Sequence, residues 1–366
     1  MNKNDTIKYE TTQPIVPGET VLEFLKSRGM TQLELAKRLG RPIKTINEIT
    51  KGKASITPET AIQLEHVFGI PASFWNNLES QYQEIRLRLE SEKQYHGLVS
   101  KSKIYPYREM VRYGWIEDAS NSLRQVEHLL KYFGVTNFGN IIEESKLKSA
   151  FRISEKYQYS LPAVVSWLRK GSIDGEQIAT ESFDKNQVLK LLPRLREMTL
   201  ITNPNELMRK LEEEFKKCGI AFVVTRSLKS APINGATRWI SPNKALIQIS
   251  IRWKWADIFW FSLFHELGHI LLDKKKDFNV DLVNSKIDSA SEKEKDQFAR
   301  DQLISQESYQ KLIDSIKAVN NFSSYQLIEN FALQSGIHPG IVVGRLQYDG
   351  VIPNSMNKLR IRFSWI

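Results

Sequence analysis

Cysteine is nearly absent, because the 366-residue chain contains only Cys218. A single thiol excludes an internal disulfide framework and suits a reducing compartment such as the cytosol. Cys218 stands between an expected helix end and an apolar strand. We therefore interpret it as a packed structural residue and not as a catalytic thiol.

Long apolar runs and targeting signals are also missing. No run of 18 apolar residues occurs, and residues 1–6 lack the apolar segment of a signal peptide. The residues that are present, 41% hydrophobic and 10% aromatic, suffice for a buried core, and the length suits two or three domains. We therefore expect a cytoplasmic protein with no membrane partner.

Charge is unbalanced towards the positive side. Lys and Arg number 52 against 42 Asp and Glu, which gives a formal net charge of +10. The excess is dense in residues 26–53, which contain eight Lys or Arg and two Glu. Such a balance favours an anionic partner, with nucleic acid first, although many basic proteins bind no nucleic acid.

The pattern of residues 18–82 predicts short helices only. Thr31 and Glu34 have the spacing of a capping box, and Gly40 ends the helix that they begin. Isoleucines at three-residue spacing from position 43 mark the buried side of the next helix. Two short helices joined by a tight glycine turn, within a five-helix unit, are typical of a helix-turn-helix domain.

Polar and charged side chains on the outer side of the second helix suit DNA recognition. There they can read base edges, while flanking positive charges neutralise phosphates. The residues on this outer side are Lys44, Thr45, Asn47 and Glu48. Two alternatives stay open: a helical bundle with an ordinary solvated face, and a domain that only docks a protein partner.

The segment from Thr31 to Lys53, with residues 56–61 and 68–75, resembles the Cro/repressor-type helix-turn-helix, especially the HigA-like antitoxins. The resemblance implies that Gln32 contacts a phosphate and that the stretch from Arg41 to Glu48 faces the major groove of operator DNA. Proteins of this type commonly bind two half-sites as dimers, so a homodimer is consistent with the sequence.

Residues 258–272 combine an apolar helix with titratable side chains. They contain His265, Glu266 and His269 in the pattern His-Glu-x-x-His. Residues four apart lie on nearly the same face of a helix, so both imidazoles can reach one Zn²⁺ while Glu266 serves as a base towards the attacking water. The pattern also arises by chance. This helix has no charged outer face, and buried charged residues need a partner or a metal, which favours the zinc site.

A zinc hydrolase needs a third protein ligand from elsewhere in the chain. The helix expected from residue 291 carries Glu292 and Asp296 on one face, with Glu294 nearly opposite. Glu292 would complete the ligand set, and Asp296 would orient an imidazole. The alternative is an ordinary solvated helix start, because Glu, Lys and Asp alternate here. His338 and Tyr348 are further donors that a zinc protease could use to stabilise an oxyanion, and we assign neither.

Three strands are predicted before the histidine-bearing helix, over residues 220–225, 235–240 and 245–251. The last alternates polar and apolar residues, which fits one wet face. A strand beside a zinc site can bind an extended peptide that adds to the sheet edge, so this strand could hold a substrate. The middle of the chain, residues 83–200, predicts further helices and no chemistry.

The histidine motif and the Glu-x-Glu-x-Asp-x-Phe-Ala stretch from Glu292 to Ala299 resemble the ImmA/IrrE family of zinc metallopeptidases, as do residues 235–239, 245–249 and 339–350. The resemblance spans about residues 200–350. It implies a Zn²⁺ ion with the ligands His265, His269 and Glu292, and Glu266 as the base.

The chain departs from this family at two places. Lys295 stands where the family usually has a small residue, commonly Ala, and a lysine there would either disturb the packing beside the site or point outward. Residues 301–305 lack the proline that often follows this helix.

The sequence thus predicts a mainly α fold with a small β-sheet, of the α+β class, in three parts. These are a five-helix DNA-binding domain (18–82), a helical connector (83–200) and a zincin-like metallopeptidase domain (201–350). The family association is with toxin–antitoxin modules, in which such peptidases cut helix-turn-helix repressors. The expected function is a DNA-binding regulator with a zinc endopeptidase that cuts a repressor or partner protein. The alternative is an antitoxin-like repressor that binds operator DNA and a toxin, with the peptidase-like domain as a sensor or relic.

Overall fold

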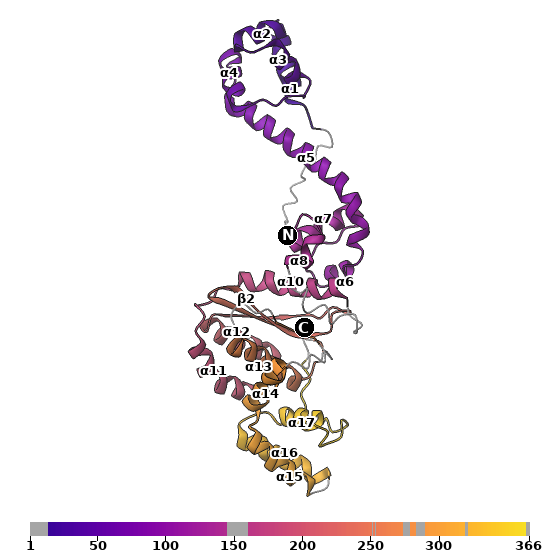
Figure 1. Ribbon diagram of the computed structural model, residues 1–366, viewed down its shortest axis with the longest axis vertical. Helices are drawn as coiled ribbons and strands as arrows, with labels where there is room; N and C mark the ends of the chain where they lie inside the picture. The colour runs from indigo at the N-terminus through magenta and orange to yellow at the C-terminus, as the bar shows by residue number, and fades with distance from the viewer. Residues whose placement is uncertain are drawn as a thin grey trace, which may run out of the picture. The chain divides into compact units, whose positions relative to one another are not determined.

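The computed structural model describes residues 14–144, 160–250, 252, 254–273, 279–282, 290–318 and 321–363. The chain forms two compact units, Met1–Val99 and Ser100–Ile366 (Figure 1). The described residues form mainly helices and one small sheet, as the sequence predicts. None of the described helices is both long and apolar enough to cross a lipid bilayer.

The first unit consists of helices whose ends follow the sequence signals. They are α1 (Pro17–Ser27), α2 (Gln32–Leu39), α3 (Ile43–Thr50), α4 (Pro58–Phe68) and α5 (Ala72–Ser102), whose last three residues belong to the second unit. The hydroxyl of Thr31 accepts a hydrogen bond from the amide of Glu34 at 3.1 Å and caps α2. Gly40 ends α2 with a left-handed backbone (φ 66°), which glycine adopts at little cost. This turn joins α2 to α3 as a helix-turn-helix.

Apolar side chains from the five helices close the core of the first unit. Leu35, Ile46 and Leu64 are buried, and Phe68 packs against Trp75 with ring centroids 5.9 Å apart. Each large apolar side chain that is fully buried contributes about 1.5–3 kcal/mol to stability. In α3, Ile46 and Ile49 are buried, whereas Ile43, which the spacing placed on the buried side, is 39% exposed at the start of the helix. Lys44 is exposed, and Thr45, Asn47 and Glu48 are partly exposed.

The second unit begins with a helical part that leads to the sheet. Its helices are α6 (Tyr107–Arg112), α7 (Ser122–Phe133), α8 (Gly139–Glu144), α10 (Leu161–Gln177), α11 (Lys185–Glu197), the 3-10 helix η2 (Met198–Leu200) and α12 (Pro204–Lys217). The strands are β1 (Ile220–Thr225), β2 (Ile233–Ser241), β3 (Lys244–Ser250) and β4 (Asn279–Leu282). The later helices are α13 (Ala256–Leu272), α14 (Ala290–Leu303), α15 (Gln306–Lys317), α16 (Asn321–Ser335) and α17 (Pro339–Tyr348).

The sheet has the strand order β1-β3-β2-β4. Strand β3 pairs in parallel with β1 and antiparallel with β2, with Gly235 opposite Ile249, and β4 pairs antiparallel with β2. The expectation that the third strand could hold a substrate peptide at the sheet edge is therefore wrong, because β3 is a central strand. Both edges of β3 are already hydrogen-bonded, and Gln248, which the alternation placed on a wet face, is buried.

Helix α10 covers one face of the sheet, and α12 and α13 lie on the other (Figure 1). Small residues let α10 approach, because a Cβ at Gly175 would come within 2.7 Å of the Leu246 side chain. The amide of Gln248 donates to the carbonyl of Trp167 at 2.7 Å, which satisfies this buried polar group. A helix from the stretch predicted as a connector thus forms one layer of the second unit.

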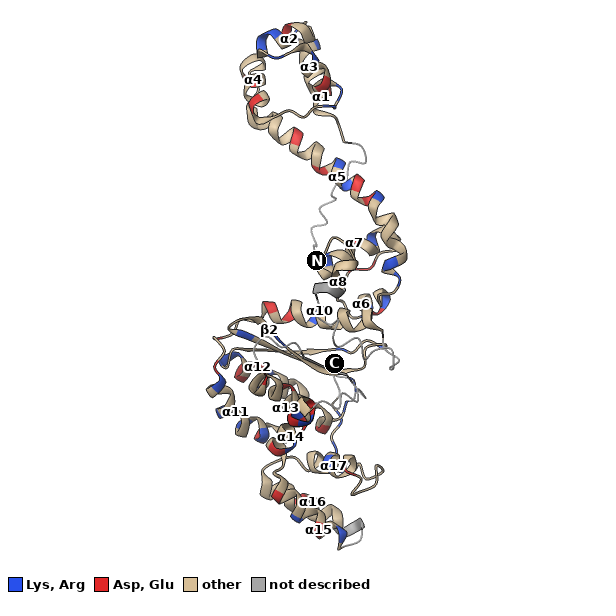
Figure 2. Ribbon diagram, viewed as in Figure 1, with Lys and Arg blue, Asp and Glu red and all other residues tan. Residues whose placement is uncertain are grey.

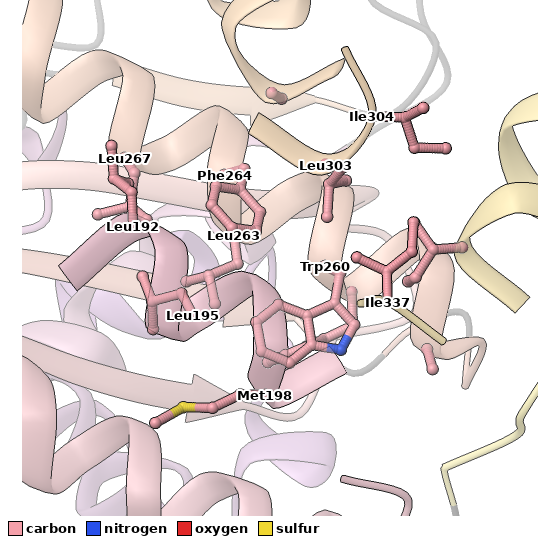
Figure 3. Close-up of a cluster of buried hydrophobic side chains, with 14 of the residues drawn as sticks. Leu192, Leu195, Met198, Trp260, Leu263, Phe264, Leu267, Leu303, Ile304 and Ile337 are labelled. Carbon is pink, nitrogen blue, oxygen red and sulfur yellow. The ribbon is translucent and has the colours of Figure 1, made fainter. Parts of the chain in front are cut away.

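Helix α13 is the centre of the second core. Figure 3 shows Trp260, Leu263, Phe264 and Leu267 of this helix among side chains from α11, α14 and the segment before α17. Trp260 and Phe264 are fully buried. Packing on almost every side explains why the helix has no charged outer face. The polar residues that α13 does contain are therefore held by their neighbours rather than by water.

Candidate metal centre and nucleic-acid interface

The buried helix α13 places His265, Glu266 and His269 beside α14. The two histidines are each 4% exposed and Glu266 is fully buried. Helix α14 brings Glu292 to the same place, and its side chain is 30% exposed. His265, His269 and Glu292 offer one ligand atom each, and these atoms all lie within 4.8 Å of one another.

The distances between these ligand atoms are short on every side. His265 Nε2 lies 3.2 Å from His269 Nε2 and 3.3 Å from Glu292 Oε2. His269 Nε2 lies 3.7 Å from the same carboxylate oxygen. The structure therefore brings together the three residues that the sequence proposes as ligands.

Carboxylates behind the imidazoles determine which ring nitrogen carries a proton. His265 Nδ1 donates to Asp296 Oδ1 at 3.0 Å, and His269 Nδ1 donates to Asp273 Oδ2 at 2.6 Å. A carboxylate can only accept, so the proton on each neutral ring is assigned to Nδ1. Each Nε2 then keeps a lone pair directed at the other and at Glu292.

This donor set fits a zinc ion. Two imidazole nitrogens and a carboxylate are common zinc ligands, and ligands about 2.0–2.1 Å from zinc in a tetrahedron are separated by about 3.3 Å. The three measured separations are close to that value. Three protein ligands also leave the fourth position open, as in catalytic zinc sites.

Glu266 is held on the sheet side of α13 by β2. Thr237 Oγ1, itself 2% exposed, donates to Glu266 Oε2 at 2.5 Å. Gly235 lies against the same carboxylate, because a Cβ there would come within 2.8 Å of Glu266 Cδ and Cγ. The glycine provides the room and the threonine fixes the orientation of this side chain.

Burial and hydrogen bonding shift the pKa values at the site. Burial lowers the pKa of His269, which favours the neutral imidazole that a metal requires. Burial alone would raise the pKa of Glu292, but its interactions with His265 and His269 outweigh burial, and the pKa lies below its usual value. Glu292 is therefore ionised at neutral pH.

Lys295 neither disturbs the packing nor points outward. It is 1% exposed, and its Nζ lies 2.5 Å from Asp273 Oδ1. Gly268 accommodates it, because a Cβ at that position would lie 3.2 Å from Lys295 Cγ. The expectation of a disruptive or outward lysine is therefore wrong.

His338 and Tyr348, to which we assign no role, lie in other settings. His338 caps α17 by accepting a hydrogen bond from the amide of Gly340 at 3.0 Å. Tyr348 is 77% exposed, with the guanidinium of Arg300 5.5 Å from its ring centroid.

The side chains predicted to contact DNA lie on α2, on α3 and, for Arg41, in the turn between them, and Figure 2 shows Lys and Arg gathered around α2. Lys44 is open, with 84% of its side chain exposed and its Nζ 3.9 Å from Glu48. Gln32, Thr45, Asn47 and Glu48 are partly exposed. Arg41 differs, because its guanidinium bonds Gln63 at 2.6 Å and pairs with Glu59 at 3.1 Å.

Sequence reasoning missed Gly235, Thr237 and Asp273 at the metal site. It also missed that Lys295 pairs with Asp273. Asp273 carries a local signal, since it follows His269 by four residues and so falls on the same helix face. Gly235 and Thr237 carry none, because only the packing of β2 on α13 brings them to Glu266.

Comparison with protein families finds two matches. Residues 21–75 match the helix-turn-helix family, and residues 223–315 match the IrrE N-terminal-like domain of the M78 peptidases. Virulence-associated protein I of Dichelobacter nodosus is 39% identical over 69 residues, which are 19% of this chain and 64% of that protein. This chain thus spans less than two thirds of that relative.

A second relative is covered more fully. The HTH-type transcriptional regulator YddM of Escherichia coli strain K12 is 32% identical over 66 residues, 18% of this chain and 70% of that protein.

Two solved structures are also similar. The antitoxin HigA of Pseudomonas aeruginosa, solved with the higBA promoter, is 34% identical with a TM-score of 0.22 and covers 22% of this chain and 90% of its own. A HigA-family antidote protein from Coxiella burnetii is 34% identical with a TM-score of 0.22, over 23% of this chain and 94% of its own.

The family matches fall on both parts of the molecule described above. The helix-turn-helix match covers α2, α3 and α4, and the IrrE-like match covers β2, β3 and the site on α13 and α14. This chain therefore belongs to the Cro/repressor-type helix-turn-helix family and joins that domain to an IrrE-like domain of the M78 peptidase family.

Proposed function

We propose that this protein is a DNA-binding transcriptional regulator of the cytoplasm whose second unit is a zinc-dependent endopeptidase. Its substrate would be a repressor or another partner protein. The observation that supports the peptidase is the cluster of His265, His269 and Glu292 with Glu266 held beside it. Zinc bound there would supply a Lewis acid that polarises a peptide carbonyl and lowers the pKa of the attacking water.

The chain's own residues would perform the proton transfers. Glu266 accepts a proton from the attacking water at its carboxylate and returns it to the amine of the departing peptide. Thr237 holds that carboxylate in one rotamer, so the base is oriented before substrate arrives. Asp296 and Asp273 keep the Nδ1 protons on the imidazoles and leave each Nε2 free of a proton.

The Glu266→Gln variant tests the peptidase. Incubated with zinc and with the proteins encoded next to it, the wild type should cut one of them, and mass spectrometry would locate the new termini. We expect Glu266→Gln to cut at least about 100-fold more slowly, which is typical for loss of a general base, while zinc content is kept. Glu307→Gln, at an exposed carboxylate on α15, is the control. If the wild type cuts none of the candidates, the non-catalytic antitoxin-like regulator becomes the better explanation.

The DNA-binding part of the proposal is supported by α3, whose outward face carries Lys44 and Asn47. We expect the full chain to retard a fragment of its own upstream region, with affinity that falls as salt increases. Asn47→Ala should cost about 1–3 kcal/mol on the specific fragment, and Lys44→Ala should weaken all sequences alike and reduce the salt dependence. Lys311→Ala, on α15 of the second unit, is the control. Unchanged binding in both variants would contradict the assignment of α3 to the major groove.

A further inference from the structure

Lys295 is an uncommon residue for the interior of a protein, and it lies one helical turn from the metal-site residues. Its side chain is 2% exposed. A buried ammonium is costly unless it is paired and fully hydrogen-bonded, and an apolar side chain of similar size would fill the same space without that cost. Its presence therefore calls for an explanation other than packing.

The surroundings of Lys295 satisfy its charge completely. An ammonium has three N–H groups, and three acceptors lie within reach of Nζ. They are Asp273 Oδ1 at 2.5 Å, Ser291 Oγ at 2.9 Å and Glu294 Oε2 at 3.2 Å. Burial alone would lower the pKa of Lys295, but its carboxylate partners outweigh burial and the pKa lies above its usual value. The side chain is therefore positively charged.

The ion pair connects directly to a metal ligand. Each carboxylate oxygen of Asp273 has a different partner. Oδ1 accepts from Lys295, and Oδ2 accepts from His269 Nδ1 at 2.6 Å. His269 in turn directs Nε2 towards His265 at 3.2 Å. Contacts thus run from Lys295 on α14 through Asp273 and His269 to the metal site.

The two histidines are supported differently. His265 is held by Asp296, whose side chain is 36% exposed, so water can help to solvate that carboxylate. The side chain of Asp273 is only 12% exposed and lies beside the lysine. Lys295 therefore supplies a counter-charge to Asp273 where little solvent reaches, whereas solvent contributes at Asp296.

We propose that Lys295 is a positioning residue for the metal site, which acts through Asp273 to hold His269 with Nε2 directed at the metal. This inference rests on the proposed zinc function of the same residues. Without the ammonium, Asp273 would be a buried carboxylate lacking this counter-charge, and it would turn towards solvent or take up a proton. Either change would release the His269 ring from its present orientation.

Zinc affinity tests the inference without any measurement of cleavage. The dissociation constant of the full chain for Zn²⁺ would be measured by competition with a fluorescent chelator. We expect Lys295→Met to weaken zinc binding at least about tenfold, since removal of a group that orients a metal-bound histidine typically costs 10–100-fold. Lys311→Met, which removes an exposed lysine paired with Glu307 at 2.7 Å, should change it less than twofold.

A second variant separates positioning from folding. Asp273→Asn combined with Lys295→Met removes both charges of this pair, and the amide oxygen can still accept from His269 Nδ1, so this chain should fold even where the single variant does not. Because an amide is a weaker acceptor than a paired carboxylate, the double variant should still bind zinc several-fold more weakly than the wild type. The inference would be overturned if Lys295→Met bound zinc as tightly as the wild type. If Lys295→Met does not fold, the same result in the double variant would overturn it. A wild type that binds no zinc would overturn the proposed function together with it.

Discussion

At the scale of single residues, the missing side chain of Gly235 leaves room for the carboxylate of Glu266. Any Cβ at this position of β2 would enter the space of the Glu266 carboxylate. We expect Gly235→Ala to displace that side chain from Thr237 and to slow peptide cleavage by at least about tenfold, because a small misplacement of a reacting group can cost up to 100-fold. Zinc content should be unchanged, since the three ligands lie on α13 and α14.

A matched substitution controls for the loss of a glycine as such. Gly97 lies in α5 and a Cβ there meets no atom within 4 Å, so Gly97→Ala should leave cleavage unchanged. Full activity in Gly235→Ala, measured by the rate of product formation in mass spectrometry, would show that Glu266 does not need this space. If Gly235→Ala lost zinc as well as activity, the substitution would act on the metal ligands and not on Glu266 alone.

The metal site could be predicted from sequence to the extent that its residues are local. His265, Glu266 and His269 follow one helical period, and Glu292 and Asp296 follow another, so each set is visible in the pattern. The meeting of the two sets depends on α13 packing against α14. Lys295 could not be placed without that packing, because a lysine in an alternating charged stretch is usually solvated.

At the scale of elements, the N-terminus of α17 is capped by His338, a side chain that titrates near neutral pH in an unfolded chain. His338 Nδ1 accepts from the amide of Gly340, and only the neutral ring can do so. Burial lowers the pKa of His338, so the unfolded chain binds this proton more readily than the folded one. The stability that the neutral cap provides is therefore complete above about pH 6.5 and is lost as the pH falls towards the lower folded pKa.

The His338→Asn variant measures this effect. Asparagine is a good helix cap and does not titrate, so its stability should fall less between pH 7.5 and pH 5 than that of the wild type. Each unit by which the pKa is lowered corresponds to about 1.4 kcal/mol. Thermal unfolding of both chains with a chelator present would be compared across this range. Parallel curves would exclude a contribution from His338.

The elements themselves were more predictable than their order in space. Thr31, Gly40 and the isoleucine spacing of α3 are local signals, and the structure contains the helices that they predict. The β-branched run at 245–251 predicted a strand correctly over Lys244–Ser250. The strand order was not predictable. Strand β3 lies between β1 and β2, and β4, which follows only after α13, pairs with β2. Pairing between distant segments leaves no local pattern.

At the scale of the whole molecule, the chain consists of two compact units with separate cores. A ligand that binds only the folded state stabilises the unit that holds it, by about 4 kcal/mol at a thousandfold excess over the dissociation constant. We expect calorimetry to show two transitions, and zinc should raise only the one that belongs to residues 100–366. For a unit of this size the rise is roughly 10 °C, at about 2–4 °C for each kcal/mol.

Two variants assign the transitions. Leu64→Ala creates a cavity in the core of the first unit, where Leu64 is 1% exposed, and should lower only the zinc-insensitive transition by an amount that reflects about 2–5 kcal/mol. Glu292→Ala removes one proposed ligand and should abolish the zinc-dependent rise while leaving the Leu64-sensitive transition in place. A single transition that zinc and Leu64→Ala both move would mean that the units unfold together, so that zinc stabilises the helix-turn-helix unit as well. Two independent transitions would mean that binding of zinc leaves the stability of the helix-turn-helix unit unchanged. Zinc binding could then not control DNA binding through the stability of that unit.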